Sequence, residues 1–255
     1  MTASHHLDVL AFAAHPDDVE LGAGGTICKL VKNGYRVGIV DLTRGELGSR
    51  GTPELRKEEA ARAAEIMGIH ARENLGLADG DLVDSPGARL RVIEVVRRYR
   101  PHVALISAPE CRHPDHPNAA RLTAHALFYA GLRKIETVDD GREPQEPWRP
   151  RHVLHYMQAV PFEPTLIVDV SDEWEQRMRA LGAYRSQVYS PDYESASDEP
   201  TTFISNPDFL AWISAQARTY GHRIGARFGE PFLYRHGPLG VDDLMAVLGR
   251  EREFV

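Results

Sequence analysis

The sequence predicts an α/β fold with a mostly parallel sheet, and three observations support this prediction. Short apolar runs alternate with segments of helical periodicity along the first half of the chain. Gly34, Gly68 and Pro101 stand where three of the helical segments end. The 255 residues are 42% hydrophobic and 26% charged, as in an ordinary globular domain. We therefore expect a single domain over residues 1–255, with a Rossmann-like fold in three layers, helices on both faces of the sheet and the active site at the carboxyl ends of the strands.

Strands and helices are expected to alternate through the first half. Apolar runs at residues 7–14, 35–42 and 102–107 predict buried strands, and residues 74–77 predict a shorter one. The second helix has the clearest start, because Thr52 is a good N-cap and proline suits the first helical position. The helices are expected at residues 21–33, 53–67, 88–99 and 118–132.

The second half is less regular, and its elements are harder to assign. Two further strands and two further helices are expected there, separated by polar loops rich in proline. The expected strands cover residues 152–158 and 165–170, one helix runs from Ser171 to about residue 185, and another lies within residues 206–227; residues 136–151 and the flexible segment 189–202 are loops, and the remainder is a loop with a short acidic-basic tail.

Composition and charge exclude several classes of protein. The formal net charge of -7 argues against nucleic-acid binding, which usually needs a basic surface. No apolar run reaches the length of a membrane span, and the first residues do not resemble a signal peptide. Cys28 and Cys111 are too few for a disulfide framework, so we expect two free thiols in a cytoplasmic protein.

Two similar motifs carry the chemistry. His-Pro-Asp-Asp at residues 15–18 follows the first predicted strand, and His-Pro-Asp-His at residues 113–116 follows the strand at residues 102–107. Because ligands bind beyond the carboxyl ends of parallel strands, we expect both motifs to meet in one crevice.

The two motifs offer three histidines and three aspartates, which are the ligand types of catalytic zinc sites. His15 and Asp18 are three residues apart, so both can face one point, and the second motif can complete the site. A remaining aspartate could take a proton from the attacking water, and a remaining histidine could stabilise the oxyanion. Each residue also has a simpler interpretation, since an aspartate here can be an N-cap and a lone histidine can be structural.

Residues 22–26, Gly-Ala-Gly-Gly-Thr, form a glycine-rich stretch close to the first motif. They do not fit the dinucleotide-binding pattern, because position 27 is isoleucine and the stretch comes too late after the strand. We expect the glycines to allow close backbone packing near the site.

The residues resemble a known family. Residues 14–18 with Glu20 and residues 24–26 resemble the opening motif of the LmbE-like (PIG-L) zinc N-deacetylases, and residues 113–116 resemble their second motif. Residues 42–52 and Arg56 are similar to the branch that makes bacillithiol, whose members deacetylate N-acetylglucosaminyl-malate. Further similarity to this branch lies at residues 59–60, 157–158, 161–164, 169–171, 184–187, 225 and 230–232.

The resemblance implies a role for each motif residue. It implies His15, Asp18 and His116 as ligands of Zn²⁺, although a His/Asp site also accepts other divalent ions. Asp17 would be the general base, and later the acid that protonates the amine.

The remaining roles concern the oxyanion and the substrate. His113 would be the cation that stabilises the oxyanion, and Asp115 would orient or tune one of the histidines. Arg56 would bind the substrate through its malate carboxylates, for which a guanidinium fork is well suited.

Four other side chains are further candidates for contact with the substrate or the oxyanion. Arg44 and Arg50 lie in the same segment as Arg56, but each is also compatible with a solvated surface charge. Tyr189 or Tyr193 could enter the site from the loop at residues 189–202 and assist the oxyanion.

The expected function is zinc-dependent hydrolysis of N-acetylglucosaminyl-malate to glucosaminyl-malate and acetate. The alternatives are a deacetylase of other N-acetylglucosaminides, an amidase of thiol conjugates, or a non-catalytic protein that binds a metal or a sugar. The expected partner is a small N-acetylated amino sugar. Relatives form hexamers or smaller assemblies, so the resemblance also implies a homo-oligomer.

Overall fold

A computed structural model describes residues 6–194, 198–235, 237–243 and 245. They form a seven-stranded sheet in the order β3-β2-β1-β4-β5-β7-β6. The strands are β1 (Val9–Ala13), β2 (Val37–Thr43), β3 (Ala71–Leu77), β4 (Val103–Ile106), β5 (His152–Tyr156), β6 (Leu166–Asp169) and β7 (Gly229–Tyr234). The helices are α1 (Asp18–Lys32), α2 (Pro53–Met67), α3 (Pro86–Tyr99), α4 (Asp115–Tyr129), α5 (Trp174–Leu181), α6 (Pro191–Glu194) and α7 (Pro207–His222).

The sheet has a parallel part that contains the switch point of the fold. Strands β3, β2, β1, β4 and β5 pair in parallel, while β7 is antiparallel to both of its neighbours. The strand order reverses direction between β1 and β4, which lie side by side. In open α/β sheets a crevice forms at this point, beyond the carboxyl ends of the two strands.

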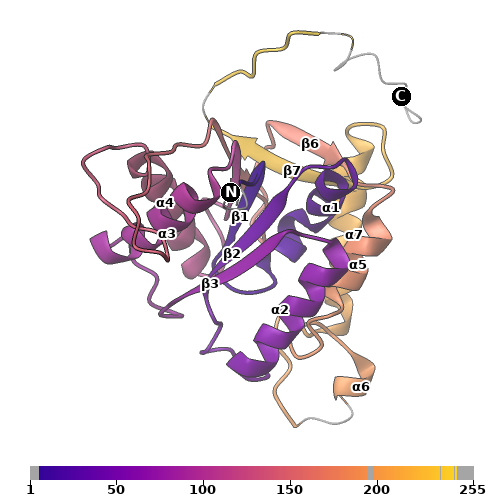
Figure 1. Cartoon of the computed structure of the whole chain (residues 1–255). Coiled ribbons are helices and arrows are strands. Elements are labelled where there is room, and N and C mark those ends of the chain that lie inside the picture. Colours follow the sequence, from indigo (N-terminus) through magenta and orange to yellow (C-terminus); the bar gives the residue numbers. More distant parts are fainter. Residues whose placement is uncertain (1–5, 195–197, 236, 244, 246–255) are drawn as a thin grey trace.

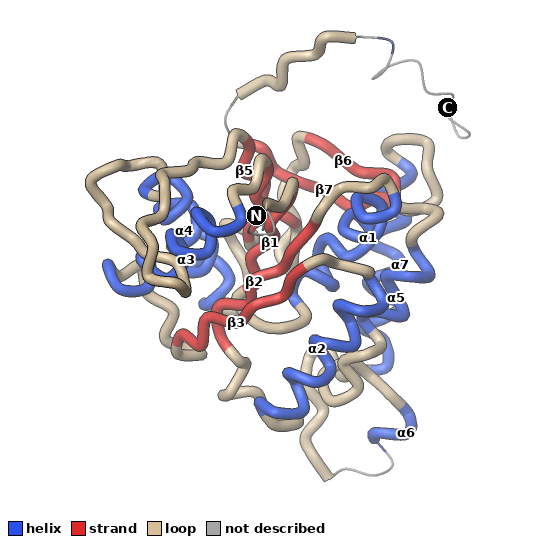
Figure 2. The backbone as a smooth tube through the Cα atoms, in the orientation of Figure 1, coloured by secondary structure: helices blue, strands red, loops and turns tan. Residues whose placement is uncertain are grey.

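The helices form two layers, one on each face of the sheet (Figures 1 and 2). Helices α3 and α4 cover one face, while α1, α2, α5 and α7 lie on the other. Side chains along β1 alternate between the layers, since Leu10 and Phe12 pack toward α3 and α4, whereas Val9 and Ala11 pack toward α1 and α2. The predicted three-layer α/β fold is therefore confirmed.

The second half departs from the prediction in three places. Residues 229–234 were expected to be loop, but they form β7 between β5 and β6. The helix expected from Ser171 covers only Trp174–Leu181, because the Ser171 hydroxyl accepts the amides of Arg227 and Phe228 instead of capping a helix. Short α6 lies inside the loop expected at residues 189–202. Most of the expected acidic-basic tail lies outside the described residues, and one domain over residues 1–255 stays a prediction.

Within the part of the chain that the structure describes, no helix is long and apolar enough to cross a membrane.

Glu20, from the first motif, belongs to a buried network of charges. Arg72 on β3 donates two hydrogen bonds of 2.9 Å to Asp41 on β2 and one of 2.6 Å to Glu20 on α1. The Tyr184 hydroxyl, beyond α5, donates to Glu20 at 3.0 Å. Since buried charges are tolerated only when they are paired and hydrogen-bonded, this network fixes α1 against two strands and the segment after α5.

The glycine-rich stretch lies within α1, where a buried ion pair contacts the helix backbone. The Glu230 carboxylate accepts the amides of Gly25 at 2.8 Å and Thr26 at 2.7 Å. Arg177, 3.1 Å from Glu230, donates to the carbonyl groups of Glu20 and Leu21. A Cβ atom on Gly25 would lie 2.8 Å from Cβ of Val170 and 3.0 Å from Glu230 Oε1. The predicted close backbone packing is confirmed.

Replacing Glu230 with alanine should lower the free energy of unfolding by about 3–5 kcal/mol, because it leaves Arg177 buried without its partner. Urea denaturation of the Glu230→Ala variant measures this loss. Glu163→Ala is the matched control, since Glu163 forms an exposed ion pair with Arg223 and its loss should leave the free energy of unfolding nearly unchanged. Equal effects of the two substitutions would contradict the role given to Glu230.

Candidate active site

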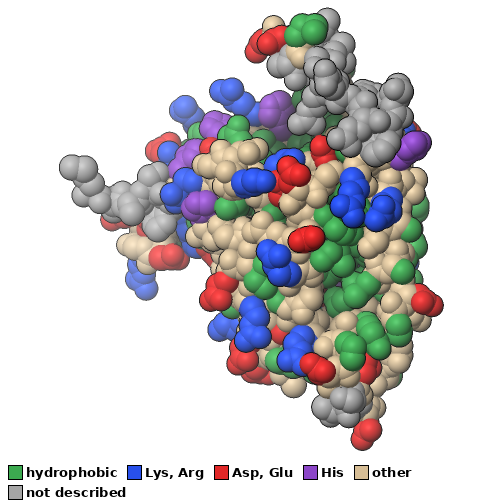
Figure 3. Space-filling model, turned by 90° about the vertical axis from the view of Figure 1, so that its right-hand side faces the viewer, with side chains coloured by type: hydrophobic (Ala, Val, Ile, Leu, Met, Phe, Trp, Pro, Cys, Tyr) green, Lys and Arg blue, Asp and Glu red, His purple; other side chains and the backbone are tan. Residues whose placement is uncertain are grey.

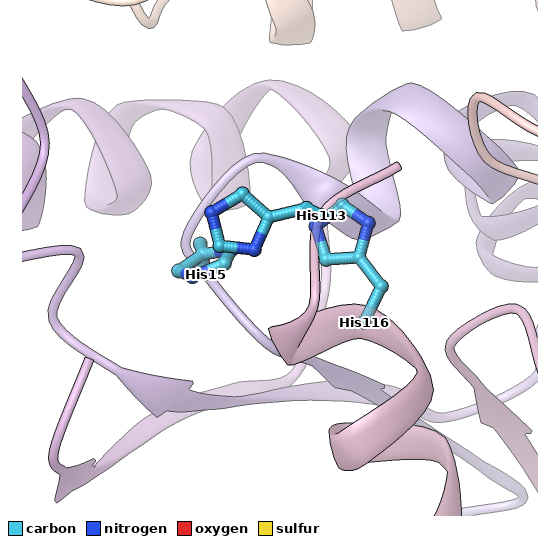
Figure 4. Close-up of side chains that lie close together, drawn as sticks. All are labelled: His15, His113 and His116. Carbon is cyan, nitrogen blue, oxygen red and sulfur yellow. The ribbon is translucent and has the colours of Figure 1, made fainter. Parts of the chain in front are cut away.

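The two His-Pro-Asp motifs meet at the carboxyl ends of β1 and β4. His15 follows β1, His113 lies two residues before α4, and His116 is in the first turn of that helix (Figure 4). The centroids of the His15 and His113 rings are 4.7 Å apart, and those of His113 and His116 are 5.1 Å apart. One nitrogen from each of the three rings lies within 4.8 Å of the others. The predicted meeting of the motifs in one crevice is confirmed.

Asp18 lies between two of these histidines. Its Oδ1 is 3.1 Å from His116 Nε2, and its Oδ2 is 3.6 Å from His15 Nδ1. Burial acts to raise the pKa of Asp18, but the His116 and His15 imidazoles outweigh it and hold that pKa well below its usual range. An ionised carboxylate with one nitrogen from each histidine fits a divalent cation, which would replace the protons on the imidazoles.

The other nitrogen of His15 faces two more carboxylates. His15 Nε2 lies 2.9 Å from Asp79 Oδ1 and 3.4 Å from Asp115 Oδ2. Asp115 is buried, and it also accepts the Gly80 amide at 2.7 Å. Its predicted role of orienting a histidine thus has a geometric basis, which it shares with Asp79.

Asp17 stands at the N-cap position of α1, but its side chain does not cap the helix. Its side chain makes no capping hydrogen bond, and its backbone has a φ of 116°, a left-handed conformation that is uncommon outside glycine. The carboxylate is buried and lines the cavity. Burial raises the pKa of Asp17 to about 6, although Arg56 acts to lower it. A carboxylate with such a pKa can both accept and return a proton near neutral pH.

Arg56 lies inside the site and holds Asp17. It donates to Asp17 Oδ2 at 2.8 Å and to the Pro16 carbonyl at 3.2 Å. Gly45 makes room for the guanidinium, because a Cβ atom at that position would lie 2.2 Å from Arg56 Nη1. Arg56 also lines the cavity, so it can contact a substrate while it holds Asp17. The predicted role in substrate binding stays a prediction.

His113 accepts a backbone hydrogen bond at Nδ1, which leaves Nε2 as the nitrogen that can donate. The Asp115 amide donates to His113 Nδ1 at 3.2 Å, so Nδ1 is an acceptor and the proton belongs on Nε2. Burial and the neighbouring His15 and His116 lower the pKa of His113. This geometry favours a neutral hydrogen-bond donor over the cation expected from the sequence.

The site opens into a cavity of about 440 Å³ with a polar floor and an apolar wall. Phe203, Phe209 and Trp212 form a cluster of rings in the wall, and 46% of Phe203 and 37% of Trp212 remain exposed. Hydrophobic side chains also gather on the surface that carries α5 and α7 (Figure 3). The floor contains His15, Asp17, Asp18, Arg56, Asp79, His113, His116 and Gln158.

Some predicted substrate contacts do not line this cavity. Arg44 is exposed, and neither it nor Tyr189 or Tyr193 is among the described lining residues. The Tyr193 hydroxyl donates to Glu199 at 2.9 Å. Arg50 is buried and pairs with Glu194, so the interpretation of Arg50 as a solvated charge was wrong. Roles for Arg44 and Tyr189 at the active site stay predictions.

Two polar residues of the floor were missed at the sequence level. Asp79 follows β3 by two residues, so the strand-end argument used for the other motifs would have found it. Gln158 follows β5 by two residues and donates to Asp18 Oδ1 at 3.0 Å. The sequence resemblance includes Gln158 but implies no role for it.

Comparison with known proteins identifies the family. The family pattern PIG-L, described as GlcNAc-PI de-N-acetylase, matches residues 10–127. Diacetylchitobiose deacetylase of Thermococcus kodakarensis is 33% identical over 195 residues, which cover 70% of this chain and 69% of that protein. The chain belongs to the PIG-L family.

Two further similar proteins are informative. A probable N-acetyl-alpha-D-glucosaminyl L-malate deacetylase 2 of Bacillus cereus is 29% identical and covers 82% of this chain and 94% of its own length. The crystal structure of a conserved protein from Thermus thermophilus is 39% identical, with a TM-score of 0.80 over 92% of this PIG-L chain and 98% of that chain. These likenesses confirm the predicted family and its fold.

Exchanging each of the adjacent aspartates for asparagine should separate their roles. Asp17→Asn should keep the bound metal ion but lower kcat for acetate release by about 10²–10⁴-fold, because the expected proton acceptor is lost. Asp18→Asn should lose the metal itself, because the anionic ligand between His15 and His116 is gone. Elemental analysis after dialysis measures metal content; loss of the metal from Asp17→Asn would contradict this division.

Proposed function

We propose that this PIG-L protein is a zinc-dependent deacetylase of N-acetylglucosamine derivatives, with N-acetylglucosaminyl-malate as its substrate. The observation that carries the proposal is the pair formed by Asp18, between two histidines, and Asp17, which is buried, strained and free of a capping bond. A purely structural metal site would have a closed set of four protein ligands and would need no adjacent carboxylate of this kind.

His15, Asp18 and His116 would hold the ion, and each remaining side chain has a task. Zinc, when bound, polarises the amide carbonyl and makes water a better nucleophile. Asp17 takes a proton from the attacking water and returns it to the leaving amine. Arg56 keeps the Asp17 carboxylate in place, and His113 donates from Nε2 to the developing oxyanion.

The cavity supports a sugar substrate with an anionic extension. The exposed rings of Phe203 and Trp212 can contact the apolar face of a pyranose. Arg56 is already hydrogen-bonded to Asp17. Arg112, next to His113, makes no ion pair with any described residue. Its guanidinium stacks on Phe203, 4.5 Å from the ring centroid. We therefore propose Arg112, together with the free side of Arg56, as the partner of the malate carboxylates.

The test of the function is acetate release by the zinc-loaded protein from a panel of N-acetylated amino sugars. We expect release from N-acetylglucosaminyl-malate, and its loss on treatment with a chelator. If the protein cleaves other N-acetylglucosaminides but not this compound, the deacetylase activity is supported and the assignment of the malate substrate is refuted. If the protein binds zinc but releases acetate from none of these sugars, the proposed deacetylase activity is refuted.

Arg112→Gln should raise KM for N-acetylglucosaminyl-malate by about 10–100-fold, which corresponds to the loss of a charged hydrogen bond. The dimethyl ester of the same compound carries no negative charge, so its KM should hardly change. Steady-state kinetics on both substrates check this, and Arg121→Gln, at an exposed position on α4, is the control variant. Equal effects of Arg112→Gln on both substrates would remove Arg112 from carboxylate binding.

A further inference from the structure

Asp79 is the closest carboxylate to the outer nitrogen of His15. It lies in the turn after β3, its side chain is only 6% exposed, and its Oδ1 is 2.9 Å from His15 Nε2. Asp115 approaches the same nitrogen at 3.4 Å. The shorter contact makes Asp79 the main hydrogen-bond acceptor for this ring.

This contact determines which nitrogen of His15 is available to a metal. A carboxylate at Nε2 holds the ring proton there and leaves the lone pair on Nδ1. Nδ1 is the nitrogen that faces Asp18, at 3.6 Å from Oδ2. A carboxylate behind a metal-binding imidazole fixes the ring orientation and makes the nitrogen a stronger ligand.

Asp79 is itself held by the loop between β2 and α2. Its Oδ2 accepts the Leu47 amide at 2.8 Å, and its own amide donates to Glu46 at 3.1 Å. Residues 47–49 of this loop line the cavity. The contacts therefore run without interruption from the loop that faces the substrate to His15.

We propose that Asp79 is a positioning residue for His15, and that it links the loop at residues 46–49 to the affinity of the metal centre. The inference rests on the proposed function only in requiring that the site binds a divalent cation. In this role Asp79 acts through His15.

The experiment measures the affinity of purified protein for Zn²⁺ alone, by competition with a chromophoric chelator. Asp79→Ala should weaken zinc binding by about 10–100-fold, as is typical when the partner of a metal-binding histidine is lost. Asp79→Asn should fall between this variant and the wild type, since an amide oxygen still accepts the hydrogen bond but carries no charge. Asp81→Asn, two residues away and exposed, is the control and should bind zinc like the wild type.

Thermal unfolding of the metal-free proteins separates positioning from folding. We expect Asp79→Asn to unfold at the temperature of the wild type while still binding zinc more weakly. Unchanged zinc affinity in folded Asp79→Ala would overturn the proposal; if that variant does not fold, unchanged affinity in Asp79→Asn would overturn it. Zinc binding is measured without substrate, so a protein that cleaves none of the sugars would refute the proposed function and leave the result for Asp79 standing.

Discussion

The position of the first motif depends on the ion pair between Arg177 and Glu230. The pair reaches the backbone of α1 from two elements that come late in the chain, α5 and β7. Because α1 begins at Asp18, any shift of this helix would move the carboxylate that we propose as a metal ligand. The irregular second half of the chain therefore has a definite task, which is to hold a helix whose first turn carries the chemistry.

Charge balance explains why so many carboxylates can share one site. Asp17 has Arg56 as its partner, whereas Asp18, Asp79 and Asp115 all face histidine nitrogens. Without a metal, the acidic neighbours raise the pKa values of His15 and His116 even though burial lowers them. A divalent ion supplies the same positive charge when it displaces those protons. The site is thus arranged for a cation before one arrives.

Strand ends could be predicted from the sequence, while side-chain pairing could not. The apolar runs before residues 15 and 113 located the site, because periodicity reports burial directly. β7 escaped prediction because Pro231 and Glu230 lie within it, and both residues are unusual in a strand that has neighbours on both sides. The contact between Arg56 and Asp17 and the tautomer of His113 depend on atoms brought together from separate elements, and no local pattern records such contacts.

The left-handed backbone of Asp17 has a consequence for how variants at this position are interpreted. Aspartate and asparagine tolerate this conformation better than most residues, whereas a side chain such as alanine is disfavoured there. Replacing Asp17 with alanine would therefore have two effects at once. It would remove the carboxylate, and it would destabilise the left-handed backbone conformation at this position.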